Sequence, residues 1–82
     1  MLHYVDIIQS ESYPSHRYVG YSADLKTRLT CHNSGNSPHT AKHTPWKLLF
    51  YSAFLNKKTA LDFEAYLKSH SGKAFAKKRL LA

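Results

Sequence analysis

Cysteine is almost absent from this chain, since Cys31 is the only one among 82 residues. A single cysteine cannot form a disulfide within the chain, which suits a reducing compartment, and we expect a cytoplasmic protein. One cysteine without a second one nearby gives poor support for a zinc site, so we expect a small, half-buried residue. The first residues enter a strand-like run with no basic leader, and we therefore expect no signal peptide.

Acidic residues and long hydrophobic runs are also scarce. Five Asp and Glu stand against twelve Lys and Arg, which gives a formal net charge of +7. Such a basic chain attracts polyanions: nucleic acid is the first candidate partner, an acidic membrane surface the second, and solubility the plainest explanation. No apolar stretch approaches the roughly 20 residues of a membrane-spanning helix, so we expect no membrane insertion.

The length limits the kind of site that the chain can form. We expect residues 1–82 to fold as a single domain of globular composition, with 43% hydrophobic and 21% charged residues. A domain this short buries only about 60% of the surface that its unfolded chain exposes, so its core is small. A shallow surface cleft is therefore the expected kind of site.

Three segments have the composition of β-strands. Residues 2–8 are rich in Tyr, Val and Ile, and residues 17–21 form a shorter strand after a polar loop, which predicts an antiparallel hairpin. Residues 46–51 form a third strand directly after Pro45. We expect Trp46 to anchor the core where this strand begins.

Helices are expected between and after these strands. The first has Ser22 as its N-cap and Asp24 in its first turn, and it runs to about residue 33, where Gly35 provides a left-handed stop. A polar connection over residues 36–42 contains at most one helical turn.

Two more helices follow the third strand. Asn56 caps a helix over residues 57 to about 70, which Ser71 and Gly72 interrupt. Residues 73–81 form a final basic helix, with Phe75 and Leu80 as inward anchors. The predicted class is α/β (α+β): a small, three-stranded, mostly antiparallel sheet flanked by helices.

Arg28 and His32 stand four residues apart in the first helix, so they share one of its faces. A guanidinium can hold two phosphate oxygens at once, and an imidazole can accept or donate a proton near neutral pH. On spacing alone, a solvated polar stripe is the preferred interpretation, since such pairs are common.

Glu64 is a more specific candidate for chemistry. It stands at the edge of the apolar stripe of its helix, beside Phe63, so its carboxylate points toward the sheet. A carboxylate in that position could bind Mg²⁺, which takes few protein ligands and keeps several waters. An ordinary ion pair with Lys68, four residues later, explains Glu64 equally well.

Tyr18 and Gly20 stand together at the end of the second strand. The phenol can contact a phosphate or a metal-bound water, and the glycine allows a sharp turn or the close approach of a backbone. Taken alone, they would be a core tyrosine and a turn glycine.

Taken in order, these segments resemble the GIY-YIG nuclease family. Tyr18-Val19-Gly20 resembles the second half of the family motif, and residues 22–29 resemble the first helix, with its arginine ten residues after the tyrosine. Residues 31–35, 45–48 and 60–64 resemble the next segment, the third strand and the acid-bearing helix. The resemblance covers almost the whole chain. It points to small, single-domain bacterial members similar to the nuclease module of the excision-repair protein UvrC.

The resemblance implies a role for each candidate residue. Glu64 would be the only direct protein ligand of a divalent cation, Mg²⁺ or Mn²⁺, with solvent and substrate completing its inner shell. Arg28 would hold the scissile phosphate. Tyr18 would contact the attacking water or the phosphate and could act as the base, and His32 would stand near the nucleophile. These roles require Arg28 and Glu64 to face each other across the same end of the sheet.

One position departs from the family pattern. The first half of the motif should end in tyrosine, but here it reads Tyr4-Val5-Asp6. A phenol is neutral and donates a hydrogen bond, whereas a carboxylate is charged and only accepts, so Asp6 would repel a phosphate unless a metal intervened. Three interpretations stay open: a disabled site, a site rebuilt around a second metal-binding acid, and a site in which Tyr4, on the same face as Asp6, replaces the missing tyrosine.

Charge and resemblance together predict a divalent-metal-dependent endonuclease that hydrolyses DNA phosphodiester bonds in repair or recombination. The alternatives are a catalytically impaired nucleic-acid-binding module, in which Asp6 replaces the motif tyrosine, and an accessory protein that docks on a larger repair or restriction partner. The expected contacts with the DNA backbone are Gly20, Lys42, Lys73 and Lys77, although a solvated helix face explains much of the C-terminal charge. Preference for branched or damaged DNA would come from its shape or from a protein partner.

Overall fold

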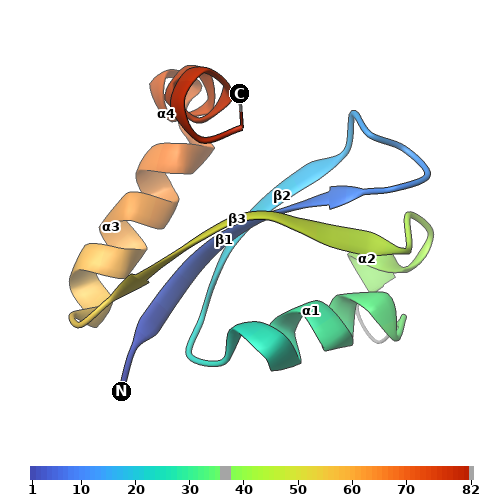
Figure 1. Ribbon diagram of the computed structural model, residues 1–82, viewed down its shortest axis with the longest axis horizontal. Coiled ribbons are helices and arrows are strands. Elements are labelled where there is room, and N and C mark those ends of the chain that lie inside the picture. Colours follow the sequence, from blue (N-terminus) through green and yellow to red (C-terminus); the bar gives the residue numbers. More distant parts are fainter. Residues whose placement is uncertain (36–37, 82) are drawn as a thin grey trace.

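The computed structural model describes residues 1–35 and 38–81. Strands and helices follow one another in the order shown in Figure 1. They are β1 (His3–Ser10), β2 (Arg17–Ser22), α1 (Leu25–Asn33), α2 (Pro38–Ala41), β3 (Trp46–Phe54), α3 (Lys57–Lys68), α4 (His70–Phe75) and η1, a short π-helix (Ala76–Leu80). The predicted α+β class, a small antiparallel sheet with helices around it, is confirmed. No described helix is long and apolar enough to cross a membrane.

The sheet has the order β2-β1-β3, and both pairs of neighbouring strands are antiparallel. β1 is central because its apolar residues are buried on both faces. Side chains alternate along it, so Val5 and Ile7 lie on one face and Asp6 on the other. The register places Asp6 opposite Gly20 on β2 and Tyr51 on β3, which forms one row across the sheet.

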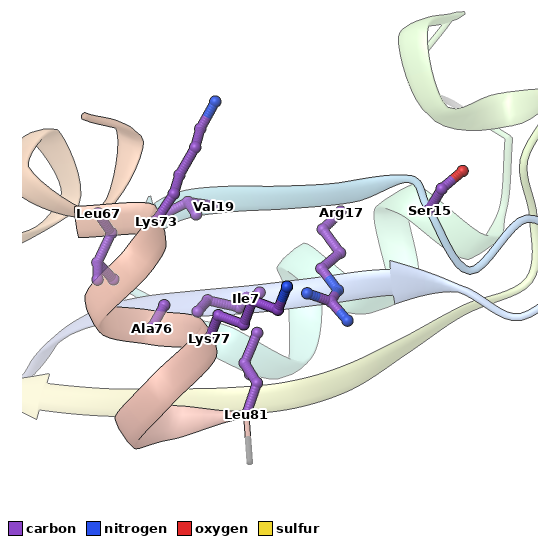
Figure 2. Close-up of a pocket in the computed structure, with 9 residues that line it drawn as sticks. All are labelled: Ile7, Ser15, Arg17, Val19, Leu67, Lys73, Ala76, Lys77 and Leu81. Carbon is purple, nitrogen blue, oxygen red and sulfur yellow. The ribbon is translucent and has the colours of Figure 1, made fainter. Parts of the chain in front are cut away.

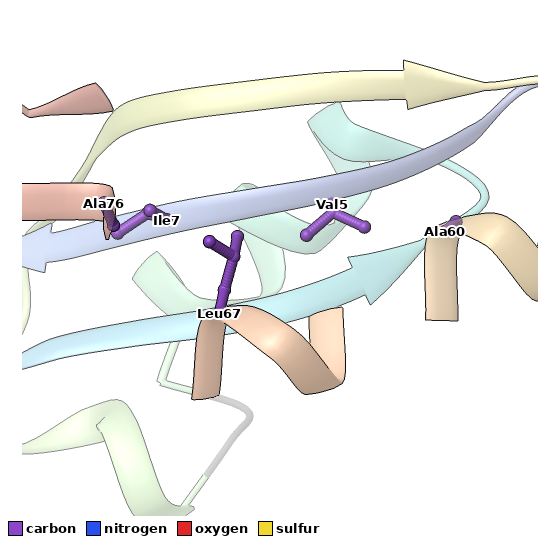
Figure 3. Packing of buried hydrophobic residues seen from close by; sticks show 5 residues of the cluster. All are labelled: Val5, Ile7, Ala60, Leu67 and Ala76. Carbon is purple, nitrogen blue, oxygen red and sulfur yellow. The ribbon is translucent and has the colours of Figure 1, made fainter. Parts of the chain in front are cut away.

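The two faces of the sheet are covered unequally. Val5 and Ile7 pack against Ala60, Leu67 and Ala76, so α3, α4 and η1 close one face around the main core (Figure 3). Helix α1 lies on the opposite face (Figure 1) and has no fully buried residue. The face that carries α3 therefore holds the apolar core, whereas the other face buries polar side chains, including Asp6, against α1.

Helix α1 begins two residues later than predicted. Asp24, and not Ser22, is its N-cap: the Asp24 carboxylate accepts hydrogen bonds from the Thr27 backbone at 3.1 Å and from the Thr27 hydroxyl at 2.8 Å. Ser22 is instead the last residue of β2. The predicted left-handed stop is confirmed, because Gly35 has a φ of 81°.

The break between the last helices also differs from the prediction. Ser69 ends α3 and caps α4, because its hydroxyl accepts a hydrogen bond from the Gly72 N–H at 3.0 Å. Gly72 lies inside α4 and does not break a helix. It is required there because a Cβ would lie 1.7 Å from the backbone oxygen of Tyr66. Phe75 is 37% exposed and packs on Tyr66, so Ala76 is the inward anchor and the expectation for Phe75 was wrong.

Other local predictions have mixed outcomes. Asn56 caps α3 as expected, and α2 supplies the single helical turn, with residues 36 and 37 of that connection outside the described part of the chain. Trp46 anchors the start of β3, is 2% exposed, and donates from its indole N–H to the Thr40 carbonyl at 2.9 Å. Cys31 is exposed, so the expectation that it is half-buried was wrong.

Candidate functional site

A buried ion pair joins the central strand to α1. The Arg28 Nε donates to the Asp6 Oδ2 at 2.7 Å, and Asp6 is fully buried. The other carboxylate oxygen, Oδ1, is buried and has no hydrogen-bond partner among the described residues. Burial raises the pKa of Asp6, and the hydrogen bond and the charge of Arg28 oppose that rise. Asp6 therefore holds the guanidinium that the resemblance assigns to phosphate binding.

Gly20 makes room for this guanidinium. It lies opposite Asp6 on β2, and a Cβ at Gly20 would lie 2.1 Å from the Arg28 Nη2 and 2.3 Å from the Arg28 Cζ. Any side chain at this position would displace Arg28 from the sheet. The glycine of the motif therefore admits the arginine, and its expected contact with DNA stays a prediction.

His32 holds the other side of the guanidinium. The Arg28 Nη1 lies 2.7 Å from the His32 Nε2, and the His32 Nδ1 lies 2.8 Å from the Thr40 hydroxyl. Arginine can only donate, so Nε2 accepts, and the proton of the neutral ring is on Nδ1 and points to Thr40. Burial, and then the charge of Arg28, lower the pKa of His32. Thr40, which is 2% exposed, was not predicted as part of the site, because no motif or spacing in the sequence distinguishes it.

This arrangement makes stability depend on pH. Because the pKa of His32 is lowered below its ordinary value of 6.5, the unfolded chain binds a proton that the folded chain does not. The contribution of neutral His32 is therefore complete above pH 6.5 and is lost as the pH falls through the window below it. We expect His32→Gln, which can accept from Arg28 and donate to Thr40 but does not titrate, to flatten the pH dependence of urea unfolding.

The matched control for this experiment is His70→Gln, at an exposed histidine of α4. That variant should keep the pH dependence of the wild-type protein. An unchanged dependence in His32→Gln would contradict the assigned protonation state.

Glu64 lies on α3, which packs against β1 and β2 on the face of the sheet opposite α1 (Figure 1). Its carboxylate forms the expected ion pair with Lys68 at 3.2 Å, and its side chain is 19% exposed. The negative charge of Glu64 is also one of the causes that raise the pKa of Asp6, after burial. Helices α1 and α3 cover opposite faces of the sheet (Figure 1). Glu64 therefore acts on the Arg28 site through its negative charge, which raises the pKa of Asp6, the carboxylate that accepts from Arg28.

The two motif tyrosines occupy different surroundings. Tyr18 is 39% exposed and lies on the same face as Asp6, with its ring 5.3 Å from that of Trp46. Tyr4 also shares that face, but its ring is 6.4 Å from that of Tyr51 on β3. The Tyr4 ring therefore lies near Tyr51, within β3, and the Tyr18 ring lies near Trp46, where β3 begins.

The predicted lysines divide between two surfaces. Lys42 is exposed and follows α2, beside His43. Lys73 and Lys77 instead line a groove of about 340 Å³ with Arg17, on the face that carries α3 (Figure 2). The Lys77 side chain extends toward Arg17, whereas the Lys73 ammonium points away from Arg17 (Figure 2). These two lysines therefore do not lie on the Arg28 surface.

The candidate residues of this small domain come from separate segments. Tyr18 and Gly20 lie on β2, Arg28 on α1 and Glu64 on α3. The model of the GIY-YIG catalytic domain matches residues 3–79, and the chain belongs to the GIY-YIG family.

The chain is similar to several bacterial proteins with the name UPF0213. It is 40% identical to one from Streptococcus pneumoniae serotype 4 over 52 residues, which are 62% of this chain and 52% of that protein. It is 42% identical over 52 residues to another, from Streptococcus pyogenes serotype M5, covering 62% of this chain and 56% of that one. The matched segments thus span about half of the length of these relatives.

A solved structure extends the similarity to the whole fold. It is the solution NMR structure of the UPF0213 protein BH0048 from Bacillus halodurans, which is 28% identical to this chain with a TM-score of 0.59. The alignment covers 98% of this chain and 87% of that one. The three-stranded sheet with its flanking helices is therefore the fold of this relative as well.

Proposed function

We propose that this chain is a divalent-metal-dependent endonuclease that hydrolyses DNA phosphodiester bonds. The observation that carries the proposal is the fixed guanidinium of Arg28, which Asp6 and His32 hold over the bare backbone of Gly20. A preorganised cation is what a phosphoryl-transfer site requires, because it stabilises charge in the transition state without reorganising. The family is usually one of nucleases, which agrees with this chemistry.

Each residue would contribute a separate step. The Arg28 N–H groups that Asp6 and His32 leave unused would bind the scissile phosphate. Tyr18, 39% exposed on the same face, would orient or deprotonate the attacking water. His32 is neutral, so it can take up a proton once a phosphate draws Arg28 away from its Nε2.

The acids of the site fit a hard divalent cation. Glu64 offers a partly exposed carboxylate, and Asp6 offers a buried oxygen that has no hydrogen-bond partner among the described residues. Mg²⁺ commonly takes one or two carboxylates and keeps several waters, so Glu64 would hold Mg²⁺ or Mn²⁺, with Asp6 as a second donor. Within the described residues no group of three or more His, Cys, Asp or Glu could hold a metal. A bound cation would lower the pKa of its water and neutralise phosphate charge.

A specific observation favours a second candidate function. Asp6 stands at the position of a motif tyrosine, and its charge offsets that of Arg28 at 2.7 Å. A guanidinium neutralised in this way binds a phosphate more weakly, which would leave a nucleic-acid-binding module with little turnover. Lys42, and also Lys73 and Lys77 on the other face, would still attract DNA. The proposed endonuclease would act in repair or recombination, and a protein partner would supply its specificity.

Nicking of supercoiled plasmid separates the two functions. We expect the wild-type protein to nick DNA with Mg²⁺ or Mn²⁺ and to stop when a chelator is added. Salt-sensitive binding without nicking under any metal would instead establish the binding module, and no binding at low salt would leave only an accessory role. The informative variant is Asp6→Tyr. If it gains nicking that the wild-type protein lacks, Asp6 disables the site, and if it loses nicking, Asp6 is a working ligand.

A further inference from the structure

A continuous series of aromatic rings extends from Tyr18 to the tip of the β1–β2 hairpin. The Tyr18 ring lies 5.3 Å from that of Trp46, which lies 6.4 Å from that of His43. The His43 ring stacks on that of His16 at 4.1 Å, and the Tyr13 ring meets His43 edge-on at 5.1 Å. We call these five residues the aromatic platform. None of its members other than Tyr18 has a role in the proposed chemistry.

Hydrogen bonds to backbone carbonyls hold the platform in place. The Ser10 hydroxyl donates to the His43 carbonyl at 2.6 Å, and the Ser10 N–H donates to the His16 carbonyl at 3.0 Å. The His16 N–H in turn donates to the Tyr13 carbonyl at 2.8 Å. The hairpin tip is therefore tied both to itself and to the segment before β3. Rings that are already fixed lose little conformational entropy when they bind a ligand.

Three rings of the platform reach solvent. Tyr13 is 53% exposed, Tyr18 is 39% exposed and His16 is exposed, whereas His43 is half-buried and Trp46, 2% exposed, supports Tyr18 and His43 from the interior. Lys42 adds a positive charge beside His43, and Glu11 is the one acid of the hairpin loop. Exposed rings beside a cation, in a chain of net charge +7, have the composition of a surface that stacks bases and attracts phosphates.

We propose that the aromatic platform stacks the unpaired bases of a DNA strand whose backbone passes Tyr18. This inference rests on the proposed function and specifies its substrate class: DNA with a single-stranded segment beside the scissile phosphate. Bases within a duplex already stack on each other and cannot use the rings, whereas unpaired bases can. The position of Tyr18 at one end of the platform places the stacked strand against the candidate active site.

Binding without metal tests the platform separately from cleavage. In chelator, a short labelled single strand should bind more tightly than its duplex. Tyr13→Ala should weaken single-strand binding about tenfold, since stacking contributes about 1–3 kcal/mol per base, whereas Tyr13→Phe keeps the ring and should bind like the wild-type protein. The matched control is Tyr66→Ala, at a 42%-exposed tyrosine of α3 outside the platform, which should leave binding unchanged.

An abasic strand of the same length provides the decisive comparison, because it keeps the phosphates and lacks the rings to be stacked. We expect it to bind at least about tenfold more weakly than the normal strand, because stacking contributes about 1–3 kcal/mol per base. Equal binding of the two strands, or an unchanged affinity in Tyr13→Ala, would overturn the inference even if the protein nicks DNA. Base-dependent binding in a protein that never nicks would overturn the proposed function and leave the platform established.

Discussion

Replacing Arg28 with alanine should lower the free energy of unfolding by about 3 kcal/mol, because it leaves the buried Asp6 without its partner. We take the lower end of the usual range because the Arg28 side chain is 17% exposed and solvent weakens the pair. A domain of this size has only about 3–5 kcal/mol of stability, so much of the variant would be unfolded at room temperature. Urea unfolding followed by circular dichroism measures the loss.

A second variant separates the structural role of Arg28 from its chemical role. Arg28→Ala combined with Asp6→Asn removes both charges, so most of the lost stability should return. Nicking should remain at least about a hundredfold below the wild-type rate, because no guanidinium is left to bind the phosphate. If the double variant nicks like the wild-type protein, Arg28 has no part in the chemistry.

The same pair of variants has a pH signature. The pKa of Asp6 is already raised above its ordinary value of 3.8 by burial, and loss of Arg28 removes the two largest opposing causes. An acid with a raised pKa binds its proton more readily when folded, so its contribution to stability falls as the pH rises through the window above 3.8. The stability difference between Arg28→Ala and the double variant should therefore shrink as the pH falls from neutral toward 3.8.

Replacing Glu64 with glutamine should abolish metal-dependent nicking and leave the fold almost unchanged. Metal-assisted charge stabilisation contributes several kcal/mol to such reactions, so we expect a loss of about a thousandfold. The ion pair with Lys68 is partly exposed, and its loss should change the free energy of unfolding by no more than about 0.5 kcal/mol. Plasmid nicking and urea unfolding measure the two effects.

Lys68→Gln is the matched control for Glu64. It breaks the same 3.2 Å ion pair but keeps the carboxylate, so nicking should persist. Equal losses in the two variants would show that the ion pair, and not a metal-binding carboxylate, is what the protein needs at this position.

Local chemistry in the sequence predicts much of this fold. Segments rich in Tyr, Val and Ile locate the strands, Asn56 caps a helix as predicted, and Gly35 provides the left-handed stop. The start of α1 was misplaced because Ser22 and Asp24 are both good caps, and only the extent of β2 decides between them. Phe75 was misplaced because the turn at Ser69 rotates the last helices.

The candidate site could be predicted only in part, because it depends on contacts between distant segments. Helical spacing brings Arg28 and His32 together, as observed. The bond from Arg28 to Asp6 depends on the register between β1 and β2, and that from His32 to Thr40 on the path of the loop after α1. Asn33, whose side-chain amide donates to the Trp46 carbonyl at 3.0 Å, was missed for the same reason.

The central claim is that the Glu64 carboxylate and the Asp6–Arg28 pair form one site for a divalent cation and a phosphate. The most direct test follows the backbone amide signals of the isotope-labelled protein while Mn²⁺, which broadens nearby resonances, is added. We expect the amides of Asp6, Gly20 and Glu64 to broaden together, and the effect to disappear in Glu64→Gln. Broadening that avoids Asp6 and Gly20, or that persists in Glu64→Gln, would contradict the shared site.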